Sequence, residues 1–115
     1  MTTTQTGQTV SLESLLADWE GQGIRNVLFE LPDMHGVARS KIVPLNKVEG
    51  FAEKGLNMYG GTVALDSRSF VISGTRYNEE VNYADQVLKP DLSTAAVVPW
   101  LNHTARLICD AYWAD

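Results

Sequence analysis

The chain has 115 residues, a length that suits one compact domain. Hydrophobic residues make up 44% of it and charged residues 20%, as in ordinary folded domains. The net charge is −5 and no basic run occurs, so we predict no nucleic-acid partner. No apolar run approaches the roughly 18 residues that span a membrane, and residues 1–10 lack the features of a signal peptide. We therefore expect a cytoplasmic protein without a membrane partner.

Cysteine and histidine are too few and too scattered for a predicted metal centre. Cys109 is the single cysteine, and His35 and His103 are far apart in the sequence. Neither histidine lies in a known zinc-binding spacing. We predict no metal site in this chain, and a packed, unreactive thiol at Cys109 because it lies in an apolar strand.

The first predicted elements are a tail and a helix. Residues 1–9 are rich in Thr and Gln and are predicted to be a disordered tail, before a folded domain over residues 10–115. Ser11 is a good N-cap for a helix over 11–20, and Gly21 and Gly23 end it. The apolar stripe of this helix comprises Leu12, Leu15, Leu16 and Trp19.

A hairpin and a second helix follow. Residues 24–31 and 37–43 are predicted strands, and the turn over 32–36 supplies Pro, Asp and Gly. Asp33 and His35 are expected to be structural in this turn. Asn46 is predicted to cap a second helix that Gly55 ends.

The remainder of the chain is predicted to be strands and loops. Strand pieces are expected at 63–65 and 70–72, a long loop at 74–83, a turn-rich connection at 85–94, and strands at 95–100 and 105–110. Asp91, Ser93 and Thr94 are expected to hydrogen-bond their own backbone. This order indicates an α+β fold with one small mixed sheet and one or two helices packed on one face.

Three motifs, in order along the chain, resemble the glutamine synthetase family. Residues 29–44, FELPDMHGVARSKIVP, resemble its opening hairpin, and residues 88–94, LKPDLST, resemble its Pro-Asp-x-Ser-Thr turn. Val-Pro-Trp at 98–100 with residues 105–110, ARLICD, is similar to the strand pair that closes its N-terminal domain. The resemblance implies a β-grasp N-terminal domain over residues 10–115.

The same resemblance implies an ATP-dependent ligase that joins glutamate to ammonia or to an amine. Its larger catalytic domain, absent from these residues, would bind ATP and Mg or Mn, so we expect no cofactor in this chain and no activity from it alone. The expected partners are the catalytic domains of its own and the neighbouring subunit in a homo-oligomer. One loop of the N-terminal domain would complete the neighbour's active site.

The nearest match to that completing loop is Leu65-Asp66-Ser67-Arg68-Ser69, where typical members have Phe-Asp-Gly-Ser-Ser. The resemblance implies that Asp66 binds and deprotonates ammonium or the amine, with Ser67 or Ser69 nearby. Arg68 and Ser69 would contact substrate. The missing glycine and the added Arg68 favour relatives that use larger amines, such as polyamines or ethanolamine.

Other interpretations of these residues stay open. Asp66 alternatively caps a turn between two strands, and Arg68 alternatively is a solvated surface residue. Trp19, Trp100 and Trp113 are expected to be core or interface anchors. The alternative function is a stand-alone β-grasp module that binds other proteins without catalysis.

Overall fold

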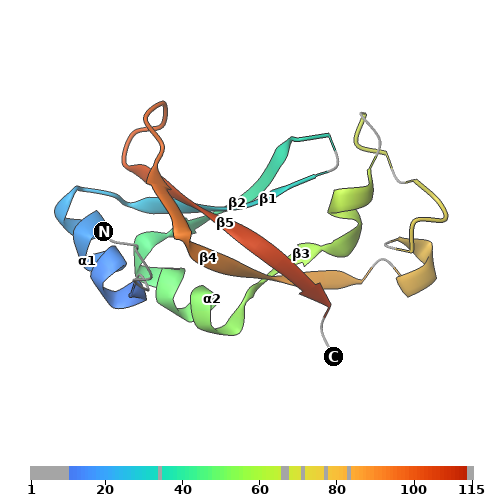
Figure 1. The fold of residues 1–115 in the computed structure, drawn as a ribbon, viewed down its shortest axis with the longest axis horizontal. Helices are drawn as coiled ribbons and strands as arrows, with labels where there is room; N and C mark the ends of the chain where they lie inside the picture. Colours follow the sequence, from blue (N-terminus) through green and yellow to red (C-terminus); the bar gives the residue numbers. More distant parts are fainter. Residues whose placement is uncertain are drawn as a thin grey trace.

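The computed structural model describes residues 11–33, 35–65, 68–70, 72–76, 78–82 and 84–113, without the side chains of 63, 64 and 79. Five strands form one sheet in the order β2-β1-β5-β4-β3 (Figure 1). Their bounds are β1 Asn26–Pro32, β2 Ala38–Pro44, β3 Leu56–Tyr59, β4 Asp85–Val97 and β5 Thr104–Trp113. The central pair β1 and β5 is parallel and the other pairs are antiparallel, so the sheet is mixed.

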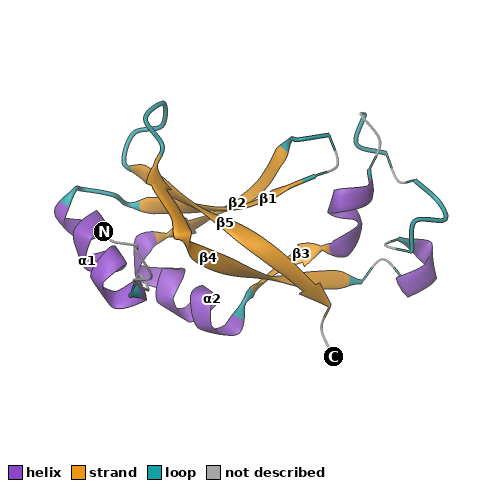
Figure 2. Cartoon of the chain, viewed as in Figure 1, coloured by secondary structure: helices purple, strands orange, loops and turns teal. Residues whose placement is uncertain are grey.

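Two α-helices, α1 (Leu12–Gly21) and α2 (Val48–Lys54), lie on the same side of the sheet (Figure 2). Short 3-10 turns occupy η1 (Leu45–Lys47), η2 (Gly60–Ala64) and η3 (Glu79–Val81). This arrangement is a small β-grasp-like α+β domain, which confirms the predicted fold class. The predicted tail over residues 1–9 lies outside the described residues.

Helix α1 confirms the predicted helix over 11–20. The side chain of Ser11 accepts a hydrogen bond from the Ser14 backbone N–H at 3.4 Å, so it caps the helix as expected. Trp19 is 3% exposed and packs in the core, while Leu12, Leu15 and Leu16 are partly buried against that core. The apolar stripe thus attaches α1 to the sheet.

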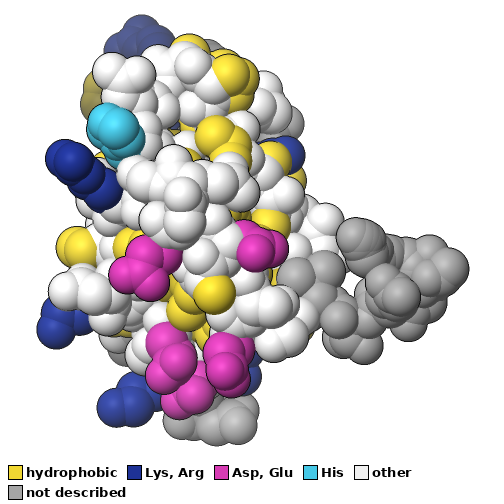
Figure 3. Space-filling model, turned by 90° about the vertical axis from the view of Figure 1, so that its left-hand side faces the viewer, with side chains coloured by type: hydrophobic (Ala, Val, Ile, Leu, Met, Phe, Trp, Pro, Cys, Tyr) yellow, Lys and Arg dark blue, Asp and Glu magenta, His cyan; other side chains and the backbone are white. Residues whose placement is uncertain are grey.

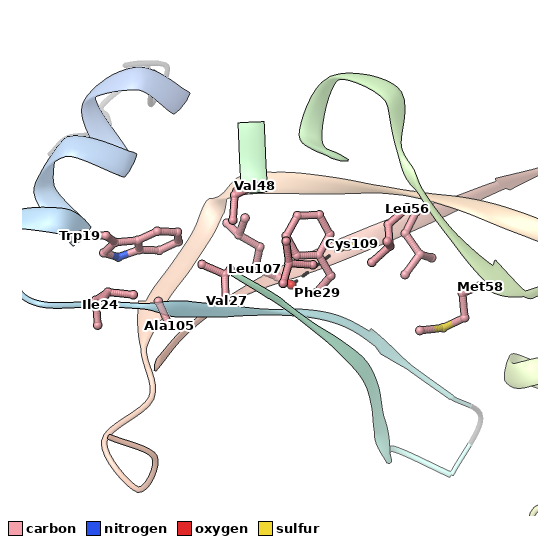
Figure 4. Packing of buried hydrophobic residues seen from close by; sticks show 12 residues of the cluster. Trp19, Ile24, Val27, Phe29, Val48, Leu56, Met58, Ala105, Leu107 and Cys109 are labelled. Atoms are coloured by element: carbon pink, nitrogen blue, oxygen red, sulfur yellow. Dashed lines mark hydrogen bonds between the residues drawn. The ribbon is translucent and has the colours of Figure 1, made fainter. Parts of the chain in front are cut away.

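The core lies between the helices and the sheet and runs the length of the strands. Val27 and Phe29 on β1 and Leu107 on β5 are fully buried, because alternate residues of a strand face the same side. Figure 4 shows them in one row with Trp19 and the Ile24 side chain at one end and Met58 at the other. The predicted hairpin is confirmed, with Val27 opposite Val43 in β1 and β2.

Helix α2 forms where a second helix was predicted, but the predicted cap at Asn46 is wrong. Residues 45–47 form the turn η1, so the helix begins at Val48 and Lys47 takes the N-cap position without a side-chain hydrogen bond. Gly55 ends the helix as predicted. Its φ of +89° suits glycine, and a Cβ at this position would overlap the Val87 side chain.

The strand pieces predicted at 63–65 and 70–72 are wrong. Residues 60–64 form the 3-10 turn η2, Leu65 makes only an isolated bridge, and neither Phe70 nor Ile72 lies in a strand. The strand in this region comes earlier, as β3, and pairs with the beginning of β4. Short apolar runs fit a strand or a turn packed on the core equally well, which explains the error.

Strand β4 replaces the turn-rich connection predicted at 85–94 and includes the first half of the strand predicted at 95–100. The prediction relied on Pro90, which is rare inside paired strands. Strand β3 pairs with β4 only as far as Leu88, so at Pro90 only β5 is paired with β4. Proline is tolerated there because the strand has one neighbour instead of two.

The Asp91-Leu92-Ser93-Thr94 turn survives as a bulge inside β4. Asp91 pairs with Ile108 and Ala96 with Arg106, so the register shifts between them. Asp91 Oδ1 accepts from Ser93 N at 3.0 Å, and the Thr94 hydroxyl donates to Asp91 O at 2.6 Å. These bonds confirm the expected bonding of the turn to its own backbone, and Ile108 N donates to Thr94 Oγ1 at 2.8 Å to close the bulge.

Candidate functional site

The candidate loop lies next to the turn that joins β1 and β2. Arg68 and Ser69 are described and exposed, whereas the predicted catalytic residues Asp66 and Ser67 lie outside the described residues. Figure 1 shows the hairpin tip and the chain after η2 at the same end of the molecule. The geometry of the site is therefore built from the residues on both sides of 66–67.

Asp33 organises the hairpin turn. Its Oδ1 accepts from the backbone N–H groups of His35 at 2.8 Å and Val37 at 3.0 Å. Its Oδ2 accepts from Arg39 Nε at 3.0 Å, and the Asp33 side chain has no solvent exposure. The buried carboxylate therefore has hydrogen-bond partners on both oxygens, and the prediction that Asp33 and His35 are structural is consistent with this geometry.

The pKa of Asp33 lies below its ordinary value. Burial acts to raise the pKa, but the hydrogen bonds from Val37 and His35 and the nearby Arg39 guanidinium favour the ionised form and outweigh it. Asp33 is thus a carboxylate at neutral pH. It neutralises Arg39 and holds its guanidinium in one orientation.

Two hydrogen bonds join the β1–β2 hairpin to the candidate loop. His35 Nε2 lies 3.0 Å from Leu65 O, and since a carbonyl only accepts, Nε2 carries the proton. Arg39 Nη2 donates to Ser69 Oγ at 3.1 Å. The first bond reaches Leu65, just before residues 66–67, and the second reaches Ser69, just after them. The hairpin therefore holds the loop at both ends. We call His35 and Arg39 the loop tethers.

The side chains of the described part of the loop are also fixed. The Arg68 guanidinium lies over the Phe70 ring, 5.1 Å from its centre, in a cation–π contact. Ser69 has a φ of +67°, an uncommon conformation for a residue with a side chain. The bond from Arg39 contributes to holding Ser69 in this backbone conformation.

The glycine pair before the loop is required by close packing. A Cβ on Gly60 would come within 2.8 Å of the Trp113 ring and 3.0 Å of Ala84 O. A Cβ on Gly61 would overlap Asn78 Oδ1 and the Tyr59 ring. The chain enters the η2 turn along a path that only glycine can take.

Asn78 secures the segment that follows the loop. It is fully buried, accepts a hydrogen bond from the Tyr59 hydroxyl, and donates from Nδ2 to Ile72 O at 3.1 Å and Thr75 Oγ1 at 3.4 Å. A buried amide with these partners ties β3 to Ile72 and Thr75. The candidate loop thus lies between two anchored regions.

The remaining candidate chemistry is limited among the described residues. They contain no group of three or more His, Cys, Asp or Glu side chains that could hold a metal ion. Described residues therefore offer no ligand set for the Mg or Mn that the resemblance implies, and we derive no step through metal or nucleotide here.

Burial raises the pKa of the Cys109 thiol to about 12, as expected for a packed, unreactive cysteine. No helix in the described part of the chain is long and apolar enough to cross a membrane.

Sequence patterns missed the loop tethers and Asn78. Arg39 lies on β2 opposite Leu31, and only the observed turn brings its side chain to both Asp33 and Ser69. Asn78 lies in a polar stretch typical of an exposed loop, and no local signal marks it as buried. The Asp-x-His-Gly turn was the one usable signal, since Asp often bonds backbone N–H groups two residues on.

Together, the fold and the loop define a small β-grasp-like domain that presents one polar loop beside its first hairpin. Human lengsin is 36% identical over 91 residues, which cover 75% of this chain and 17% of lengsin. Glutamine synthetase of Methanococcus voltae is 31% identical over 113 residues, which cover 89% of this chain and 23% of that enzyme. No family model matches the chain.

Solved structures of GmaS, a protein of the glutamine synthetase family, show the same fold. One of them, a complex with ADP, superposes with a TM-score of 0.64 at 25% identity, covering 86% of this chain and 20% of GmaS. These similarities confirm the resemblance seen in the motifs: the chain is a relative of glutamine synthetase family proteins. It spans less than a quarter of the length of the curated relatives given above.

Proposed function

We propose that this chain is the N-terminal domain of an ATP-dependent ligase that joins glutamate to ammonia or another amine. In this proposal its 65–69 loop completes the active site of a neighbouring subunit, and the domain takes part in oligomer contacts. The catalytic domain, own and neighbouring, holds ATP and the divalent metal. The observation that carries the proposal is sequence similarity to glutamine synthetases. The similarity covers most of this chain but less than a quarter of the length of those enzymes.

The role proposed for the loop follows from the chemistry of a carboxylate. Asp66 attracts a cationic amine and accepts its proton, which frees the nitrogen lone pair to attack an activated glutamate carboxyl. Ser67 lies next to it in sequence and offers a hydroxyl. The loop tethers support this role because they fix both flanks of the Asp66-Ser67 pair. A fixed carboxylate loses less entropy on binding the amine than a mobile one does.

An amine larger than ammonia is the substrate that we propose. Ser67 and Arg68 replace the Gly and first Ser of the typical loop, so this loop is bulkier and carries an added positive charge. Arg68 extends over Phe70, and Arg39 reaches Ser69 from the hairpin. In this proposal, the larger side chains of the loop offer contacts that ammonia is too small to use.

The first test is a ligase assay on the isolated chain. Phosphate release is measured with ATP, glutamate, Mg²⁺ and either ammonium or an alkyl amine. We expect no turnover above a protein-free control, because the described residues lack a metal-ligand cluster. Turnover that depends on both ATP and glutamate would contradict the proposed division of labour.

The second test is the reading frame that follows residue 115. A long continuation with metal-binding glutamates supports the ligase, and an immediate stop favours the stand-alone module instead.

A third test uses the enzyme that contains both this domain and the catalytic domain. There, Asp66→Asn is expected to reduce kcat for amine transfer about 10²-fold or more, the usual size for removing a general base. An unchanged kcat in this variant would show that Asp66 does not act as the general base.

A protein-interaction module remains the second candidate because an edge of the sheet exposes apolar side chains beside charged ones. Strand β2 is an edge strand, and Ile42 on it is 60% exposed. Val37, just before β2, is 48% exposed. Exposed edge strands offer unpaired backbone groups to strands of other chains.

A further inference from the structure

A groove separates α1 from the junction between β2 and α2, at the opposite end of the domain from the candidate loop. Its volume is about 660 Å³. One wall is helix α1, the other is the chain from Pro44 through Asn46 with Glu49 of α2, and Ile24 and Arg25 lie between them. The role proposed for the 65–69 loop does not involve this groove.

The groove side of helix α1 shares Leu16 with the stripe that packs on the core. Glu13, Leu16, Ala17 and Glu20 line it, at helical positions i, i+3, i+4 and i+7. Apolar side chains therefore lie at the middle of the stripe and a carboxylate at each end, about 10 Å apart along the helix axis. Trp19, in contrast, faces the core and is 3% exposed.

The charge of the groove is negative around an apolar floor. Leu16, Ile24, Pro44 and Leu45 supply apolar surface, whereas Glu13, Glu20 and Glu49 supply three carboxylates against the single guanidinium of Arg25. Among the described residues no lysine or arginine forms an ion pair with any of these three carboxylates. Figure 3, which looks onto this end of the molecule, shows acidic side chains with apolar ones between them.

We propose that this groove binds a basic amphipathic segment of a partner polypeptide. An apolar side chain of the segment covers Leu16 and Leu45, and lysine or arginine side chains on either side of it reach Glu13 and Glu20. The apolar floor favours a polypeptide over a simple polycation, which has no apolar side chain to bury. The acidic rim favours a basic segment and speeds its encounter with the groove.

Two other occupants fit the chemistry less well. Residues 1–10 of this chain contain no lysine or arginine, so they offer no side-chain cation to the rim. A second copy of the chain has a net charge of −5, so its approach to an acidic groove is opposed by repulsion. Both remain as contrary outcomes of the experiment below.

The probe is a short synthetic peptide with leucines along one helical face and lysines along the other. Binding to the 115-residue chain is measured by fluorescence anisotropy of the labelled peptide, and its location by amide chemical-shift changes. We expect shift changes at Leu16, Ala17 and Leu45. Affinity should fall as salt rises, because screening weakens contacts between exposed charges.

The test variant combines Glu13→Gln, Glu20→Gln and Glu49→Gln, which keep side-chain size but remove the rim charge. We expect about tenfold weaker peptide binding. The matched control combines Glu80→Gln, Asp85→Asn and Asp110→Asn, which removes three charges on other elements and should leave affinity within twofold. If the two triple variants lose the same peptide affinity, the effect depends on net charge alone and the groove is not the binding site.

A second variant, Ala17→Lys, fills the groove from an exposed position on α1 and should abolish binding while far-UV circular dichroism stays unchanged. The proposal is overturned if spermidine competes with the peptide at equal charge concentration, or if a chain lacking residues 1–10 binds much more tightly. It is also overturned if the chain alone forms a dimer that the triple Glu→Gln variant breaks.

Discussion

Gly61 shows how one residue without a side chain sets the path of the polar loop. A Cβ there would overlap Asn78 Oδ1 and the Tyr59 ring, both of which belong to one hydrogen-bond network. Because Asn78 is fully buried and bonded to Ile72 and Thr75 as well, it has no room to retreat. Glycine is required here by packing and not by backbone conformation, because the φ of Gly61 is not positive.

We predict that Gly61→Ala destabilises the domain by about 1–3 kcal/mol, the usual cost of overpacking a filled site. The measurement is the free energy of unfolding in urea. Gly50→Ala is the matched control, because Gly50 lies in α2 with open space around its Cβ position. That control should be neutral or stabilise by up to about 1 kcal/mol through helix propensity. If the two substitutions change the free energy of unfolding equally, the close contacts of Gly61 do not determine its effect on stability.

At the scale of elements, the sequence predicted what local chemistry decides. Helix α1 was predictable because its cap and its apolar stripe agree, and the β1–β2 hairpin was predictable because turn residues separate two apolar runs. Strand β4 was not, since Pro90 and the Ser93-Thr94 pair indicate a turn locally. Pairing with β5 overrides that signal, and the turn persists as a bulge within the longer strand.

The candidate site was predictable only in part for the same reason. The loop around residues 66–69 could be found from its polar composition and its resemblance to a family loop. The loop tethers could not, because the Arg39–Ser69 and His35–Leu65 bonds each join residues 30 positions apart. Such contacts depend on how the hairpin and the η2 turn are placed by the sheet.

We predict that removing the Arg39–Ser69 tether loosens the loop without unfolding the domain. Arg39→Lys keeps the charge beside Asp33 but loses the forked geometry that reaches both Asp33 and Ser69. Ser69→Ala removes the acceptor. Either substitution should speed amide hydrogen exchange in peptides containing Leu65 and Ser69 about fivefold, since a typical hydrogen bond contributes about 1 kcal/mol.

The control for this prediction is Arg25→Lys, an exposed arginine at the other end of the domain. Exchange near Leu65 and Ser69 should match the parent chain in that variant. If Arg39→Lys and Ser69→Ala also leave exchange unchanged, the tether does not hold the loop in solution. Faster exchange throughout β1 and β2 would instead show a general loss of stability.

At the scale of the whole molecule, one core joins every strand and both helices. Trp19 of α1, Val43 of β2, Val48 of α2 and Met58 of β3 belong to the same buried cluster as the central strands (Figure 4). The candidate loop and the acidic groove lie at opposite ends of this core. A single continuous core favours cooperative unfolding, so we expect the helices and the sheet to unfold together.

Trp19 gives a direct test of that cooperativity. It is 3% exposed, whereas Trp100 is 80% and Trp113 42% exposed, so a Trp100→Phe, Trp113→Phe variant leaves fluorescence from the core alone. We predict that its Trp19 fluorescence and its far-UV circular dichroism change at the same urea midpoint. The reason is that α1 has no separate core to remain folded on when the sheet unfolds. A Trp19 transition at clearly lower urea would mean that α1 detaches first, and the groove between α1 and the β2–α2 junction would then exist only in the fully folded state.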